Sequence, residues 1–197
     1  MKISQFEDKI RRLMECEDLL IHKTTAGNTV SSLEHGLMPL DEARARGIEP
    51  EKEGYPGGGC DGYFPDKVSL FKVPNFIKEQ YSPMNRDNPI LAVHEKYIAH
   101  SDFSVRHYHH TYEGIIAPED ILAVAVDLHS SIDILIGDRF KSFELLPYLT
   151  DLQSKRLDTE KITPVFVYDK DDFKGLYLPK GLELSDDVRG LVKVAEK

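Results

Sequence analysis

The sequence of 197 residues contains no tryptophan, only two cysteines and no long uncharged apolar run. Cys16 and Cys60 lie in unrelated contexts without a CxxC spacing, so we expect reduced thiols and no disulfide framework. A membrane-spanning helix needs about 20 consecutive apolar residues, which are absent. The charged N-terminal segment lacks the apolar core of a signal peptide. We therefore expect a cytoplasmic protein, with secretion by a route that uses no cleaved signal as the alternative.

Basic residues are also in deficit. There are 25 Lys and Arg against 34 Asp and Glu, which gives a formal net charge of −9 with histidine neutral. Because basic residues supply most of the affinity for nucleic-acid phosphates, this balance argues against general duplex nucleic-acid binding. A local basic pocket for a small anionic cofactor is compatible with it. The sequence motifs GxGxxG, GxxxxGK[ST], HExxH and GxSxG are absent as well.

The pattern of apolar residues predicts short strands in the middle of the chain and helices mainly near its ends. Helical spacing predicts helices over residues 2–18, about 29–34, 74–80, 142–155 and 185–195. Asn28 or Thr29 is the expected N-cap of the second helix, and Gly36 is its expected C-cap. Strands are predicted over residues 18–22, 67–73, 89–94, 107–116, 122–127 and 162–168. This order, without steady β-α-β alternation, predicts an α+β fold.

We expect a single domain built around residues 18–130. Residues 1–17 form an N-terminal helix in this interpretation, and residues 131–197 form a C-terminal extension packed on the core. The stretch from Pro39 to Asp66 is rich in glycine, proline and charge, and its part 54–65 is expected to be an exposed loop.

Three segments carry residues suited to chemistry. The first is Leu20-Ile-His-Lys-Thr-Thr25, followed by Val30-Ser-Ser-Leu-Glu-His-Gly-Leu-Met-Pro39. A strand here delivers a histidine and a threonine at its end, and a short helix then closes on Gly-Leu-x-Pro. The second is the strand Lys67-Val-Ser-Leu-Phe71. The third is Thr111-Tyr-Glu-Gly-Ile-Ile-Ala-Pro-Glu-Asp-Ile-Leu-Ala-Val-Ala-Val126.

Together these segments resemble the ADP-ribosyltransferase superfamily, in particular its His-type branch of PARP-like and DarT-like enzymes. In that branch a first strand ends in His-x-Thr or His-x-Ser and is followed by a helix. A second strand brings an aromatic or hydroxyl residue to the nicotinamide, and a later segment supplies a catalytic Glu before "I-x-P-x-x-I". The resemblance covers about residues 18–127. It implies a central, mainly antiparallel split β-sheet flanked by helices.

The resemblance also implies an activity, a cofactor and a set of site residues. The implied activity is that of a glycosyltransferase, which uses NAD as a substrate and transfers its ADP-ribose to a protein or nucleic-acid acceptor. The resemblance also implies that the protein could act as a toxin. Glu113 and His22 are the implied catalytic residues. The implied NAD-binding residues are His22, Thr24, Ser69, Phe71 and Tyr81. The glycine-rich loop 54–65 is then expected to act as a lid that becomes ordered on NAD binding.

These residue types suit the chemistry. Cleavage of the glycosidic bond of NAD passes through an oxocarbenium-like state. A carboxylate such as that of Glu113 stabilises the positive charge and holds a ribose hydroxyl. His22 and Thr24 can hydrogen-bond the other ribose hydroxyls, and an aromatic ring can stack on nicotinamide.

Two other functions stay open. On a strand, alternate side chains share a face, so His107, His109, Thr111 and Glu113 would lie together and could bind zinc or another divalent metal. This predicts a metal-dependent hydrolase or a metal-binding protein. The other alternative is an inactive interaction module of the same fold, because Lys23 replaces the Gly usual after the histidine and the second strand lacks the usual Tyr.

Overall fold

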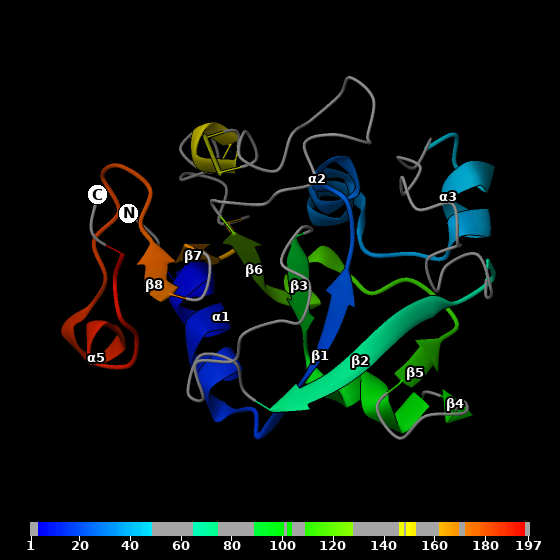
Figure 1. Cartoon of the computed structure of the whole chain (residues 1–197), viewed down its shortest axis with the longest axis horizontal. Coiled ribbons are helices and arrows are strands. Elements are labelled where there is room, and N and C mark those ends of the chain that lie inside the picture. The colour runs from blue at the N-terminus through cyan, green and yellow to red at the C-terminus, as the bar shows by residue number, and fades with distance from the viewer. Residues whose placement is uncertain are drawn as a thin grey trace.

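A mixed β-sheet of eight strands forms the centre of the molecule (Figure 1). The structure is a computed structural model that describes residues 4–48, 65–74, 89–100, 102–103, 109–127, 146–147, 149–152, 162–169 and 172–195. The strand order is β4-β5-β2-β1-β3-β6-β7-β8, and all neighbours pair antiparallel except β6 and β7, which are parallel. The strands are β1 (Asp18–Lys23), β2 (Val68–Pro74), β3 (Ile90–Val93), β4 (Asp102–Phe103), β5 (His109–Tyr112), β6 (Ile121–Asp127), β7 (Val165–Asp169) and β8 (Asp172–Tyr177).

Helices flank this sheet, which confirms the predicted α+β class. The described α-helices are α1 (Ser4–Glu15), α2 (Ala26–His35), α3 (Leu40–Ala45) and α5 (Asp186–Arg189). Two 3-10 helices, η2 (Glu95–His100) and η3 (Pro118–Asp120), precede β4 and β6. No helix in the described part of the chain is long and apolar enough to cross a membrane.

The two faces of the sheet carry separate apolar clusters because side chains alternate along each strand. In β1, Leu19 and Ile21 pack in the cluster on the side of α1, whereas Leu20 packs in the cluster on the side of α2. From α1, Phe6 and Ile10 are fully buried in the first cluster. Burial of each side chain of this size stabilises the fold by about 1.5–3 kcal/mol. Since α1 and α2 belong to different clusters, the two helices cover opposite faces of the sheet.

The helix after β1 begins earlier than the sequence suggested. Its N-cap is Thr25, whose hydroxyl accepts a hydrogen bond from the backbone N–H of Asn28. Asn28 and Thr29, the predicted caps, lie inside the helix, so that prediction was wrong. The predicted end is confirmed: Gly36 has a φ of 90°, and its N–H donates to the carbonyl of Ser32.

The strand predicted over residues 107–116 is also shorter than expected. β5 ends at Tyr112 because Gly114, with a φ of 132°, turns the chain away from the sheet. Ile116 then pairs with Leu37 through two backbone hydrogen bonds, of 2.9 and 2.8 Å, instead of continuing along β2. Part of the segment after Glu113 is thereby fixed to the end of α2.

Other differences lie near the ends of predicted elements. Neither the strand β8 nor the helix α3, which lies in the stretch 39–66 rich in glycine, proline and charge, was predicted. The helix predicted over 185–195 ends at Arg189, because Val194 forms a bridge to Leu176 beside β8. Pro74 closes β2, and residues 75–80 of the helix predicted over 74–80 lie outside the described residues. Of the helix predicted over 142–155, the described residues 146–147 and 149–152 are helical.

Residues on both sides of the expected core belong to the same sheet and the same apolar cluster. From the expected C-terminal extension, 131–197, β7 pairs with β6 and β8 pairs with β7. Phe166 and Phe173 from these strands pack in one cluster with Phe6 of the N-terminal helix. The expected boundaries at residues 17 and 131 therefore do not separate structural units in the described part of the chain.

Candidate active site

The C-terminal end of β1 holds His22 in a fixed orientation. The side chain is buried, and its Nδ1 lies 2.8 Å from the carbonyl oxygen of Ser69 in β2. Because a carbonyl only accepts hydrogen bonds, the hydrogen-bond network assigns the proton to Nδ1. In the neutral ring, Nε2 is then an acceptor, suited to a hydroxyl group that donates.

β1 and β2 part at this histidine. Their pairing ends at Ile21–Phe71, whereas β1 remains paired with β3 through His22–Leu91 and Lys23–Ile90. The His22 ring bridges the two strands just beyond their last paired residues. The end of the β1–β2 pairing is therefore marked by the His22 ring and the Ser69 carbonyl oxygen.

The two threonines after β1 have different roles. Thr25 caps α2 with its side chain and also accepts a hydrogen bond from the Thr29 hydroxyl at its carbonyl, 2.9 Å away. A structural role thus accounts for Thr25. Thr24 is equally buried, and its backbone N–H donates to the carbonyl of Pro89, which orders the turn out of β1. Thr24 follows His22 by two residues at the same edge of the sheet.

Ser69 and Phe71 lie on the face of β2 that α1 covers. Phe71 pairs with Ile21 and packs against the cluster of α1. The Oγ of Ser69 is buried and has no hydrogen-bond partner within the described residues. Because side chains alternate along a strand, His22 projects from the other face of the sheet, as does its pairing partner Leu91 in β3. A single ligand can therefore contact both His22 and Phe71 only where β1 and β2 part, and the expected convergence of these side chains on one face is wrong.

Glu113 lies at the same edge of the sheet as His22, directly after β5. β2 separates the two residues, because β5 pairs with β2 and β2 pairs with β1. At the usual spacing of strands, β1 and β5 are about 10 Å apart. The Glu113 side chain is 70% exposed and forms an ion pair with Lys67, with 2.8 Å between Nζ and Oε1. The carboxylate is accessible to a ligand at this edge.

Of the predicted site residues, the structure thus places His22, Thr24 and Glu113 at the same end of the sheet, with β2 between His22 and Glu113, and the Ser69 carbonyl oxygen lies next to the His22 ring. Phe71 lies on the opposite face. Tyr81 is outside the described residues, as is the loop 54–65 except for Pro65.

The histidine-rich strand gives no further support for a metal site. In β5, His109 pairs with Phe71 and Thr111 pairs with Ser69, so these two positions share a face as predicted. His107 and the side chain of His109 are outside the described residues. Among the residues that are described, no group of three His, Cys, Asp or Glu side chains is arranged to hold a metal ion.

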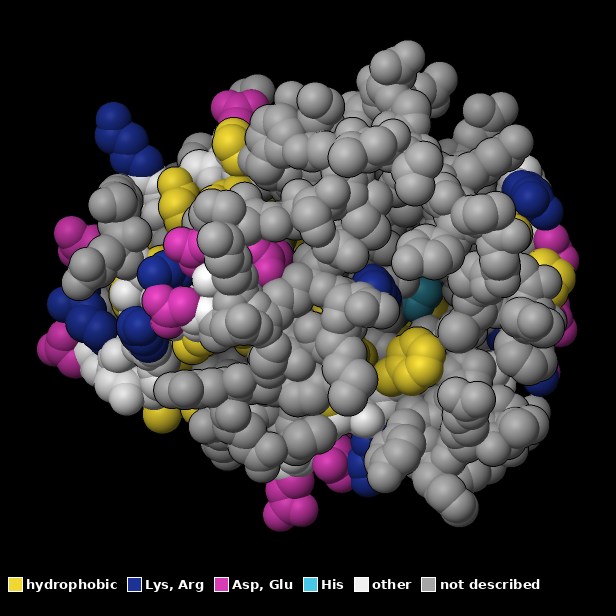
Figure 2. All heavy atoms as spheres, viewed as in Figure 1, with side chains coloured by type: hydrophobic (Ala, Val, Ile, Leu, Met, Phe, Trp, Pro, Cys, Tyr) yellow, Lys and Arg dark blue, Asp and Glu magenta, His cyan; other side chains and the backbone are white. Residues whose placement is uncertain are grey.

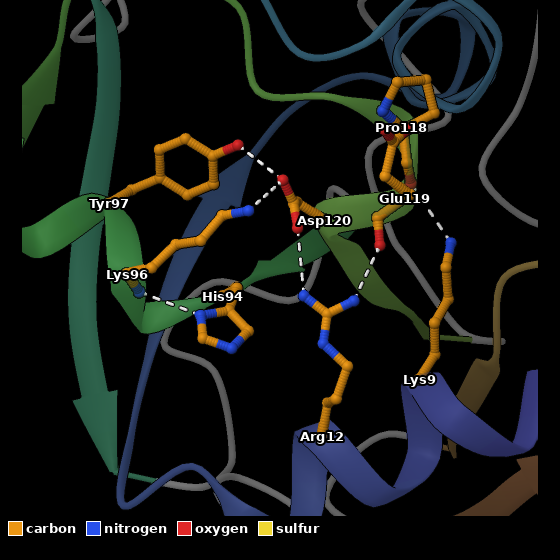
Figure 3. A network of polar contacts seen from close by, with 8 residues as sticks. All are labelled: Lys9, Arg12, His94, Lys96, Tyr97, Pro118, Glu119 and Asp120. Carbon is orange, nitrogen blue, oxygen red and sulfur yellow. Dashed lines mark hydrogen bonds and ion pairs between the residues drawn. The ribbon is translucent and has the colours of Figure 1, made fainter. Parts of the chain in front are cut away.

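A buried polar network at the opposite end of the sheet was not predicted (Figure 3). Asp120 accepts a hydrogen bond from the Tyr97 hydroxyl at 2.7 Å and forms ion pairs with Arg12 at 3.0 Å and Lys96 at 2.6 Å. Burial by itself raises the pKa of Asp120, but these donors outweigh it and lower the pKa. Burial, and next the bond to Asp120, raises the pKa of Tyr97.

Lys9 belongs to the same network. Its Nζ donates to the carbonyl of Pro118 at 3.1 Å and to the hydroxyl of Thr163 at 2.9 Å. Burial lowers the pKa of Lys9 to about 8, and the charge of Arg12 adds to this effect. One sequence feature could have revealed it: Lys9 lies three residues after Phe6 and four before Leu13, on the apolar stripe of α1.

No protein-family model matches this chain, and no curated protein is significantly similar to it.

Proposed function

We propose that this protein is an NAD-dependent ADP-ribosyltransferase that transfers ADP-ribose to a macromolecular acceptor and releases nicotinamide. One observation carries the proposal. The three strands to which the sequence resemblance assigns the site, β1, β2 and β5, are neighbours in the sheet, in the order β5-β2-β1. Their ends at one edge bear His22, Ser69 and Glu113.

The orientation of His22 supports this function. With Nδ1 donating to the Ser69 carbonyl, Nε2 accepts a hydrogen bond from a ribose hydroxyl of NAD. The end of the pairing between β1 and β2, beside the His22 ring, is the place at which the nicotinamide binds in this proposal.

Glu113 supplies the charge that the reaction needs. In the reaction, the bond between the ribose carbon and the nicotinamide nitrogen breaks, and nicotinamide leaves with the electron pair. A nucleophile of the acceptor then bonds to the ribose carbon and loses its proton. The Glu113 carboxylate, exposed at the same edge, stabilises the oxocarbenium-like state between these events.

The partners follow from the same chemistry. NAD is the small-molecule substrate, and the acceptor is a protein or a nucleic-acid end or base. Within the described residues of the face in Figure 2, basic and acidic side chains are interspersed around α5 and β8, without a continuous basic surface. General binding of duplex nucleic acid is therefore not part of the proposal.

Nicotinamide release from NAD by the purified protein tests this function, with labelled NAD and a cell lysate to identify the acceptor. Glu113→Gln should reduce release by about 10²–10³, because a nearly isosteric side chain replaces the charge. Glu119→Gln is the matched control, since this exposed carboxylate lies in η3 at the other end of β6, and it should leave release unchanged. NAD binding without release would favour the inactive interaction module, and activity that requires an added divalent metal would favour the hydrolase.

A further inference from the structure

The ion pair between Lys67 and Glu113 has unequal partners. The Lys67 side chain is 19% exposed, whereas that of Glu113 is 70% exposed. The Lys67 ammonium is therefore the more buried partner, and the Glu113 carboxylate is the partner in contact with solvent. Ion pairs with a solvent-exposed member contribute little to stability, so stability alone gives a weak reason for this contact.

The backbone places the two residues opposite each other. β2 and β5 pair with Val68 opposite Tyr112, which puts Lys67 and Glu113 at the next position, where the ladder ends. The chain on the far side of Glu113 is also constrained, because Gly114 turns it at a φ of 132°. The Glu113 backbone is thus defined from both directions, and the ion pair then restricts its side chain.

We propose that Lys67 is a positioning residue that orients the Glu113 carboxylate for the reaction. This inference rests on the proposed function. With Oε1 engaged by Lys67 Nζ at 2.8 Å, Oε2 is left for the substrate, and the ion pair favours one rotamer of the exposed Glu113 side chain. Because the carboxylate is already oriented, less entropy is lost on reaching the transition state. Loss of Lys67 should therefore lower kcat more than it changes KM.

The experiment compares the kinetics of nicotinamide release for the wild type, Lys67→Gln, Lys67→Arg, Glu113→Gln and the double variant. Lys67→Gln should lower kcat on the order of tenfold, less than the 10²–10³ expected from loss of a direct electrostatic partner. The KM for NAD should change less than about twofold. Lys67→Arg should recover most of the rate because it keeps a charged donor. In the Glu113→Gln background, Lys67→Gln should not lower kcat further, because the carboxylate that Lys67 orients is already absent.

Lys72→Gln is the matched control, since Lys72 lies in the same strand and forms its own ion pair, with Asp18 at 2.6 Å, at the opposite end of β2. It should leave kcat unchanged. Should Lys67→Gln fail to fold, Lys67→Met keeps the aliphatic stem and allows the same comparison.

The outcomes separate the two proposals. An active wild type with an inactive Glu113→Gln and a fully active Lys67→Gln overturns the positioning role and leaves the proposed function standing. Equal, additive losses in both backgrounds also overturn it, because Lys67 would then act independently of Glu113. A wild type that releases no nicotinamide overturns the proposed function and this inference with it.

Discussion

The buried ammonium of Lys9 should make stability depend on pH in the alkaline range. Burial lowers the pKa of Lys9 from 10.5 to about 8 in the folded protein. The unfolded chain, with its higher lysine pKa, therefore binds more protons between these two values, and stability rises with pH through this window. The lowered pKa of Lys9 reduces the free energy of unfolding by about 3 kcal/mol at pH 7 and by about 1.4 kcal/mol at pH 9.5.

Lys9→Met isolates this effect, because methionine fills a similar volume without a charge. The hydrogen bonds to Pro118 and Thr163 are lost at every pH, so they shift the difference from wild type by a constant. Between pH 7 and 9.5 the wild type should gain about 2 kcal/mol relative to Lys9→Met.

Urea unfolding followed by circular dichroism at pH 7, 8 and 9.5 measures this gain, provided that the m-values of the two proteins agree. Lys180→Met, at an exposed position, serves as the control and should parallel the wild type. Parallel stability curves for the wild type and Lys9→Met over this range would refute the reasoning, since Lys9 would then carry no burial penalty.

Two further substitutions test the packing around the site and the network. Asp120→Asn should cost about 1–3 kcal/mol at neutral pH, because the buried Tyr97 hydroxyl and the half-buried Arg12 lose their charged acceptor. Folding lowers the pKa of Asp120, so this difference from wild type should shrink as the pH falls below about 4, as acid denaturation can measure. Gly36→Ala should cost about 1–3 kcal/mol in thermal unfolding, because a Cβ at its φ of 90° would lie 2.7 Å from the Ile116 carbonyl oxygen. Gly47→Ala, where φ is also positive but no atom lies within 4 Å, should cost less.

Local patterns in the sequence were sufficient for the elements that begin the candidate site. β1 is short, apolar and bounded by polar residues, and Gly36 ends α2 as expected, because both depend on a few neighbouring residues. The extent of β5 was overestimated, since the pairing of Ile116 with Leu37 is a contact between distant segments.

The candidate site itself could be predicted only in part. Its residues follow from the motif, but the order β5-β2-β1 and the place where β1 and β2 part depend on pairing across the sheet. The ion pair of Lys67 with Glu113 depends on the register of β2 with β5 in the same way. Lys9 was overlooked because a lysine on an apolar stripe is usually read as a helix surface residue, whereas here Thr163 and Pro118 supply acceptors for it.

The shared core of α1 with β7 and β8 has a consequence for how the chain is made. During synthesis, α1 leaves the ribosome well before β7 and β8, but the apolar cluster of Phe6 includes Phe166 and Phe173 from those two strands. Until those strands emerge, β6, which is buried along its whole length, lacks its neighbour β7 and presents an open apolar edge. Such an edge pairs readily with other chains. The nascent protein should therefore depend on chaperone protection until β7 and β8 have emerged.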